Sequence, residues 1–185
     1  MRHRLIRTLA PGLAALVLHL AWAPYAVAQP STGAASAYSA KEWVMMGEAL
    51  HGGFGSHIAA GIRIGEDALR VLKSQRRDVD VVVTEGGNAP CACIADGVAL
   101  ATSASPGQRS LTVLPKSQDA SFLALIEVRS RRSGEAAVYR IPDSAMEPLA
   151  NMNPGTPAEG RFDRVMAMPT PQLYSMTLQP RKAVP

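Results

Sequence analysis

The chain has 185 residues, is 47% hydrophobic and 18% charged, and carries a formal net charge of +4 at pH 7 with a sequence pI near 9.4. This length predicts a single domain with one core of ordinary size. Of the 19 basic residues, three precede residue 29, where there is no acid, so 16 basic and 15 acidic residues remain beyond it. That near-neutral balance argues against nucleic acid or an acidic membrane surface as a partner.

The first 28 residues have the pattern of a secretory signal peptide. Three arginines precede an apolar run from Leu9 to Trp22, and Ala26 and Ala28 are small enough for signal peptidase. The run is shorter than the ~20 residues needed to span a bilayer. We therefore expect a periplasmic or secreted protein without stable membrane insertion after cleavage, with a retained anchor as the alternative.

Residues 29–38 are small and polar without periodicity, which predicts a flexible tether ahead of a domain over residues 39–150. Ser39 and Glu42 have the spacing of a capping box. They predict a short amphipathic helix that ends at Gly52-Gly53, because glycine favours the left-handed backbone of a helix end.

A second helix is expected from His57, because apolar residues recur after it at helical spacing: Ile58, Ile62, Leu69 and Leu72. The small residues of 59–61 would let another element approach this helix closely. Consecutive valines in residues 79–84 predict a strand that is buried on both faces. A further core helix is expected over residues 93–103, with Pro106-Gly107 beyond its end.

Three strands are predicted where β-branched and aromatic residues gather, over residues 109–114, 122–130 and 136–141. Ser133-Gly134 supplies the turn between the last two strands, beside the basic cluster Arg129, Arg131 and Arg132. A short helix should begin at Asp143 or Ser144 and run through Leu149. Because the strands are largely separated from the helices along the chain, the order favours an α+β fold, with a mixed sheet and helices packed on it.

Residues 151–185 contain six prolines, which predicts a Pro-rich C-terminal arm without a regular core element. Residues 162–178 still hold several apolar side chains. This stretch is therefore expected to pack on the domain or on a partner, and a homodimer formed through the arm is one functional hypothesis.

Four soft metal ligands lie within 43 residues of each other: His51, His57, Cys91 and Cys93. Side chains two positions apart in an extended segment point the same way, so the two cysteines could offer two thiolates to one ion. A disulfide across one intervening residue closes almost no loop, so a stapling bridge is disfavoured. With two imidazoles, the thiolates form an N2S2 set that suits zinc or copper(I).

Two other interpretations of these residues stay open. Cys93 could be a small buried hydrophobe while His51 hydrogen-bonds within a turn, or the cysteines could form a redox pair.

Three charged residues are candidates for contact with a cofactor or ligand. Arg63 and Arg109 could bind an anion bidentately, and Asp96 could orient a ligating histidine. Surface pairing of arginines and a favourable first-turn charge for Asp96 are the ordinary alternatives. The sequence has no G-x-S-x-G elbow, phosphate loop, dinucleotide fingerprint or C-x-x-C-H motif, so it leaves open whether the protein is an enzyme.

Residues 51–65, HGGFGSHIAAGIRIG, resemble the signature of the FmdE family of formylmethanofuran dehydrogenase proteins, and the matching positions are His51, Gly52, Gly61, Arg63 and Gly65. A second block, Cys93-Ile-Ala-Asp96-Gly, is similar to the family's Cys-x-x-Asp-Ala segment. Residues 105–111, SPGQRSL, follow it at the expected distance. The resemblance implies an α+β fold in which the two blocks meet around a metal-binding cleft.

The chain departs from the family pattern at several positions. Gly53 replaces a second histidine, Gly55 a cysteine, Ser56 a proline and Ala104 a further cysteine, and the C-terminal zinc module of many relatives is absent. The leading hypothesis is therefore an exported accessory domain that binds a metal or a small ligand, with His51 and Cys93 central and Cys91 or His57 assisting. A thiol oxidoreductase or metal-assisted hydrolase, and a non-catalytic homodimeric interaction module, are the alternatives.

Overall fold

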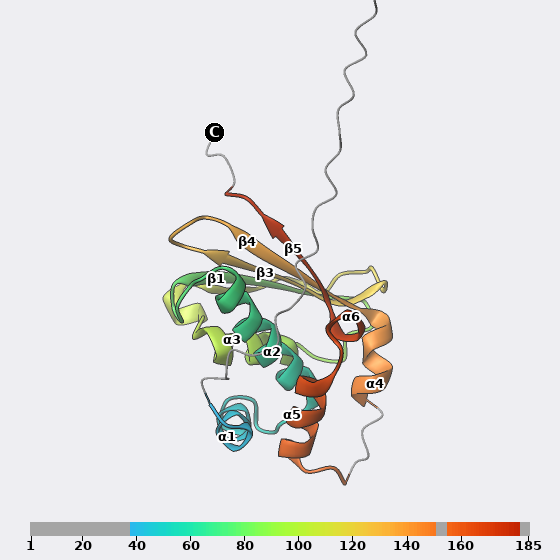
Figure 1. Ribbon diagram of the computed structural model, residues 1–185. Helices are drawn as coiled ribbons and strands as arrows, with labels where there is room; N and C mark the ends of the chain where they lie inside the picture. The colour runs from blue at the N-terminus through green and yellow to red at the C-terminus, as the bar shows by residue number, and fades with distance from the viewer. Residues whose placement is uncertain (1–37, 151–154, 182–185) are drawn as a thin grey trace, which may run out of the picture.

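The computed structural model of the protein describes residues 38–150 and 155–181 (Figure 1). The expected signal peptide and all but the last residue of the expected tether lie outside these ranges. The elements in chain order are α1 (Ala40–His51), α2 (Ser56–Val71), β1 (Val79–Glu85), α3 (Cys93–Thr102), the 3₁₀ turn η1 (Pro106–Gln108), β2 (Leu111–Val113), β3 (Phe122–Ser130), β4 (Ala136–Pro142), the 3₁₀ turn η2 (Asp143–Ala145), α4 (Met146–Ala150), α5 (Ala158–Ala167), α6 (Thr170–Leu173) and β5 (Ser175–Gln179).

The strands form one five-stranded mixed sheet in the order β2-β1-β3-β4-β5. β1 pairs with β2 in parallel, and the other neighbouring pairs are antiparallel. Figure 1 shows the helices gathered on one side of this sheet, with α1 farthest from it. The predicted α+β fold with a mixed sheet and packed helices is confirmed.

The predicted capping box begins α1: the Glu42 amide donates to the Ser39 hydroxyl, and the Ser39 amide donates to the Glu42 carboxylate. Gly52 ends the helix in the left-handed conformation with φ of 83°. Just ahead of α1, Tyr38 makes an edge contact with Trp43, and its hydroxyl accepts a hydrogen bond from Arg76. The start of the described chain is therefore tied to the domain.

α2 and α3 lie backbone against backbone. A Cβ atom added to Gly97 would overlap the carbonyl oxygen of Ile58 and come within 2.9 Å of Gly61 Cα, and one added to Gly61 would overlap the Ile94 carbonyl oxygen. The close approach expected at residues 59–61 is confirmed, and α3 is the element that makes it. This contact sets the position of α3 relative to α2.

The expectation that β1 is buried on both faces is wrong. Val79, Val81 and Val83 are buried, whereas Asp80 and Val82 are partly exposed, because helices cover only one face of the sheet.

The basic cluster at the β3–β4 turn is paired with acidic side chains. Arg129 pairs with Glu127, Arg131 with Asp80 and Arg132 with Asp78. These ion pairs balance the positive charge of the cluster.

The expectation that residues 151–185 contain no regular core element is wrong for the described part of this stretch. α5 and α6 pack there and β5 completes the sheet, with Phe162, Val165, Leu173 and Tyr174 buried. The prolines stand where helices tolerate them, since Pro157 and Pro169 are N-caps and Pro171 lies in the first turn of α6. In the part of the chain that the structure describes, no helix is long and apolar enough to cross a membrane.

Candidate functional site

The last residue of α1 meets the first turn of α3. The Cys93 sulfur lies 3.4 Å from His51 Nε2, and His51 Nδ1 lies 2.7 Å from an Asp96 carboxylate oxygen. Cys93 and Asp96 are three positions apart, so they occupy the same face of α3. The predicted convergence of His51 and Cys93 is therefore present, and Asp96 occupies the orienting position.

The hydrogen bond to Asp96 fixes what His51 can do. A carboxylate can only accept, so Nδ1–H donates and the lone pair of Nε2 faces the Cys93 sulfur. The His51 and Asp96 side chains are 34% and 36% exposed, which leaves the cluster open to solutes. An oriented, accessible imidazole nitrogen beside a sulfur atom can ligate a metal through its lone pair, or, when it carries a proton, donate a hydrogen bond to a thiolate.

Cys91 and Cys93 are joined in a disulfide, the bridge that the sequence disfavoured as a staple. Their Cα atoms are 5.3 Å apart, which lies within the range of ordinary disulfides despite the single intervening residue. Both residues are half-buried at the start of α3. Among the described residues, no group of three or more His, Cys, Asp or Glu side chains is placed to hold a metal ion.

His57 stands apart from this cluster. Its Nε2 atom is buried and has no hydrogen-bond partner among residues 38–150 and 155–181. Burial lowers the pKa of His57 below its usual value of 6.5, because the charged imidazolium would lose solvation. The predicted N2S2 set of two histidines and two thiolates is therefore not assembled in this structure.

The pKa of His57 leads to a pH-dependent contribution to stability. Because its folded-state pKa is lowered, the unfolded chain binds more protons below about pH 6.5, and the folded state loses stability as pH falls from there through the lowered pKa. We expect His57→Gln to lose less stability than the wild type between pH 7.5 and pH 5 in urea unfolding. If the wild type and His57→Gln lost equal stability over this pH range, a lowered pKa of His57 would be contradicted.

The two predicted anion-binding arginines lie elsewhere. Arg63 donates to the main-chain oxygens of Val165 and Met168 at 2.7 and 2.6 Å and to the Thr170 hydroxyl at 2.9 Å. Its guanidinium therefore ties α2 to the C-terminal helices. Arg109 is exposed, with φ of 53°, at the end of η1. The structure thus brings Asp96, but neither arginine, to His51 and Cys93.

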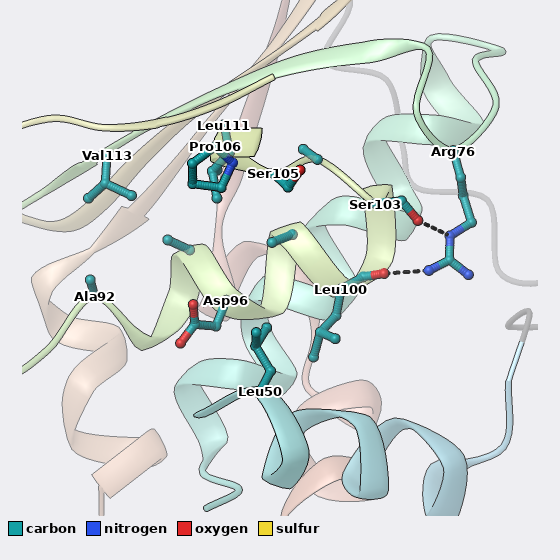
Figure 2. A pocket seen from close by; sticks show the side chains of 13 residues that line it. Leu50, Arg76, Ala92, Asp96, Leu100, Ser103, Ser105, Pro106, Leu111 and Val113 are labelled. Carbon is teal, nitrogen blue, oxygen red and sulfur yellow. Dashed lines mark hydrogen bonds between the residues drawn. The ribbon is translucent and has the colours of Figure 1, made fainter. Parts of the chain in front are cut away.

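A groove of about 560 Å³ adjoins the cluster along the outer face of α3. Figure 2 shows Ala92 and Asp96 at one end of it and Arg76 at the other, where Arg76 donates to Ser103 and to the Leu100 carbonyl. The walls are mostly apolar: Leu50, Leu100, Leu111 and Val113. Sequence reasoning missed this groove because residues from several separate elements form it.

Comparisons with known proteins bear on the family and the fold of the chain. The family described as FmdE, Molybdenum formylmethanofuran dehydrogenase operon, matches residues 50–176. A solved FmdE-like protein of the tungsten formylmethanofuran dehydrogenase type, from Syntrophus aciditrophicus, has a TM-score of 0.53 and 22% identity, over 80% of this chain and 75% of that chain. No curated protein matches the chain. The family match spans His51, Cys93 and Asp96 and continues through α5 and α6 into β5.

Proposed function

Because the chain belongs to the FmdE family, we propose that it is an exported accessory domain that binds one soft metal ion, zinc or copper(I), when the Cys91–Cys93 disulfide is reduced. The observation that carries this proposal is the line of contacts from Cys93 through His51 to Asp96. Imidazole and thiolate are the ligands that these two metals share.

The distance between the two donors fits a common ion. A zinc–nitrogen bond of about 2.05 Å and a zinc–sulfur bond of about 2.3 Å, at a tetrahedral angle, place nitrogen and sulfur about 3.6 Å apart. The His51 Nε2 and Cys93 Sγ atoms are 3.4 Å apart. The hydrogen bond from Nδ1 to Asp96 matches the carboxylate–histidine pairing that orients ligating histidines.

Cys91 supplies the third ligand of the proposed site. In the disulfide form the cluster offers one good ligand, the imidazole, since a bridged sulfur has no thiolate charge. Reduction frees two thiolates, of which Cys93 is the one in contact with His51, and the fourth position is left to water or to a ligand in the groove. His57 is not part of this proposal, because its Nε2 atom is buried without a partner among the described residues.

Metal titration of the purified protein tests the proposal. We expect the reduced protein to bind one zinc ion per chain in competition with a chromophoric chelator, and the oxidised protein to bind none tightly. Cys93→Ser and His51→Gln should each weaken binding strongly. His57→Gln is the matched control and should bind as the wild type does. Equal, weak binding by reduced and oxidised protein would defeat the proposal.

Asp96→Asn isolates the orienting role of the carboxylate. The amide keeps the size of the side chain and can still accept from Nδ1, but it lacks the charge that makes the imidazole a better ligand. We expect zinc affinity of the reduced variant to fall about 10- to 100-fold. Unchanged affinity, measured by the same competition, would remove Asp96 from the proposed site.

Export is part of the same proposal and rests on the pattern of residues 1–28. Removal of this segment would leave Gln29 as the first residue. Mass spectrometry of the protein purified from its native host should therefore find a chain that begins at Gln29. A chain that retains the segment from Met1 would contradict cleavage and favour an anchored protein.

A further inference from the structure

The Cys91–Cys93 disulfide has features that metal binding alone does not use. Its Cys93 sulfur touches an imidazole that is held by a carboxylate, and within the described chain this contact belongs to Cys93 and not to Cys91. Both cysteines are half-buried. The residue between them, Ala92, lines the apolar groove. The bridge is therefore asymmetric, partly accessible and adjacent to a ligand-sized cavity.

We infer that this bridge is a thiol–disulfide exchange site that oxidises small dithiols carried on an apolar chain. The asymmetry sets the direction of the reaction. In its protonated form His51, whose Nδ1–H is held by Asp96, can donate a hydrogen bond from Nε2–H to a thiolate on Cys93, the sulfur that it contacts. Cys93 is thus the leaving group, and the incoming thiolate attacks Cys91.

The reaction balances without another reagent. The first thiolate of the substrate forms a bond to Cys91 Sγ, the Cys91–Cys93 bond breaks, and its electron pair stays on Cys93. The second thiolate of the substrate then attacks the substrate sulfur of the mixed disulfide and releases Cys91. Two electrons and two protons move from the dithiol to the protein, which gives a cyclic substrate disulfide and a protein dithiol.

The groove determines which dithiols react well. It is large enough for a small molecule, and Figure 2 shows apolar side chains that line it, among them Leu50 and Val113. The guanidinium of Arg76 at the far end is already engaged by Ser103 and Leu100. A substrate in this groove would bury apolar carbon, and hydroxyl groups on its chain would lose hydrogen bonds to water.

The matched probes are 1,4-butanedithiol and dithiothreitol, which differ only by two hydroxyl groups. The oxidised protein is mixed with each dithiol in the presence of a chelator, and single-turnover release of protein thiols is followed. Each rate is divided by the rate with a simple reference disulfide, which corrects for intrinsic thiol reactivity. We expect the corrected rate to be about 10-fold higher with butanedithiol than with dithiothreitol.

Two variants test whether the groove causes this preference. Leu50→Asn should reduce it. Leu178→Asn should keep it, because Leu178 is exposed on β5, at the opposite edge of the sheet.

Two further measurements test the chemistry. His51→Gln should slow the reaction about 100-fold with both dithiols, while His57→Gln should not. A monothiol should be trapped on Cys91 rather than on Cys93 when the mixed disulfide is mapped by mass spectrometry. Equal corrected rates for the two dithiols, no effect of His51→Gln, or trapping on Cys93 would each overturn the inference. Because the chelator removes metal, failure of the metal proposal would leave these results unaffected.

Discussion

Gly97→Ala is expected to destabilise the domain by about 3 kcal/mol and to weaken the site at the same time. The new methyl group would overlap the Ile58 carbonyl oxygen and approach Gly61 Cα to 2.9 Å, and both neighbours are backbone atoms that cannot rotate away. α3 would have to move off α2. Because Cys93 and Asp96 both belong to α3 whereas His51 belongs to α1, this movement would also disturb the contacts of the cluster.

Urea unfolding followed by circular dichroism measures the first effect, and zinc affinity of the reduced protein measures the second. Gly107→Ala is the matched control, because a Cβ there would meet only the Ser105 hydroxyl, at 4.0 Å, among the described residues. We expect that control to change stability by less than about 0.5 kcal/mol. A Gly97→Ala protein as stable as the control would show that α2 and α3 are not held at the distance seen in this structure.

Local sequence patterns were sufficient to predict most of the helices and strands. The capping box at Ser39, the apolar period after His57 and the β-branched run at residues 122–130 each correspond to an observed element. These signals are local, because they depend on the 3.6-residue and two-residue periods of single elements. The burial of β1 was not predictable in the same way, since it depends on which faces of the sheet the helices cover.

The candidate site was predictable only in part. His51 and Cys93 each lie at a helix end that the sequence marked, and the family resemblance joined these two blocks. The disulfide was missed because the usual benefit of a bridge is loop closure, which is minimal for one intervening residue. Local geometry decides instead, and a Cα separation of 5.3 Å permits the bond. The role of Arg63 was also missed, because its partners are more than 100 residues away in sequence.

Removing residues 157–185 is expected to unfold the domain. The alternative, a dimer contact made by this segment, would instead leave a folded monomer. The segment buries Phe162, Val165, Leu173 and Tyr174, and each buried side chain of this kind contributes about 1.5–3 kcal/mol. The deletion also uncovers the edge of β4 and leaves the partly buried Arg63 without its three acceptors. The total loss, on the order of 6 kcal/mol or more, is comparable to the whole stability of many domains.

Arg63→Met tests, in a chain of full length, whether the contacts of the C-terminal segment stabilise the domain. Methionine preserves much of the packing but donates no hydrogen bonds, so the carbonyl oxygens of Val165 and Met168 lose a charged donor. We expect a loss of about 3 kcal/mol in urea unfolding, because hydrogen bonds to charged groups each contribute about 1.5–3 kcal/mol. Arg132→Met, at a 76% exposed side chain with a 3.3 Å ion pair, is the control and should change stability by less than about 1 kcal/mol. If the truncated chain stayed folded and Arg63→Met matched the control, α5, α6 and β5 would be an appendage, and a dimer contact through them would again be the better account of their apolar residues.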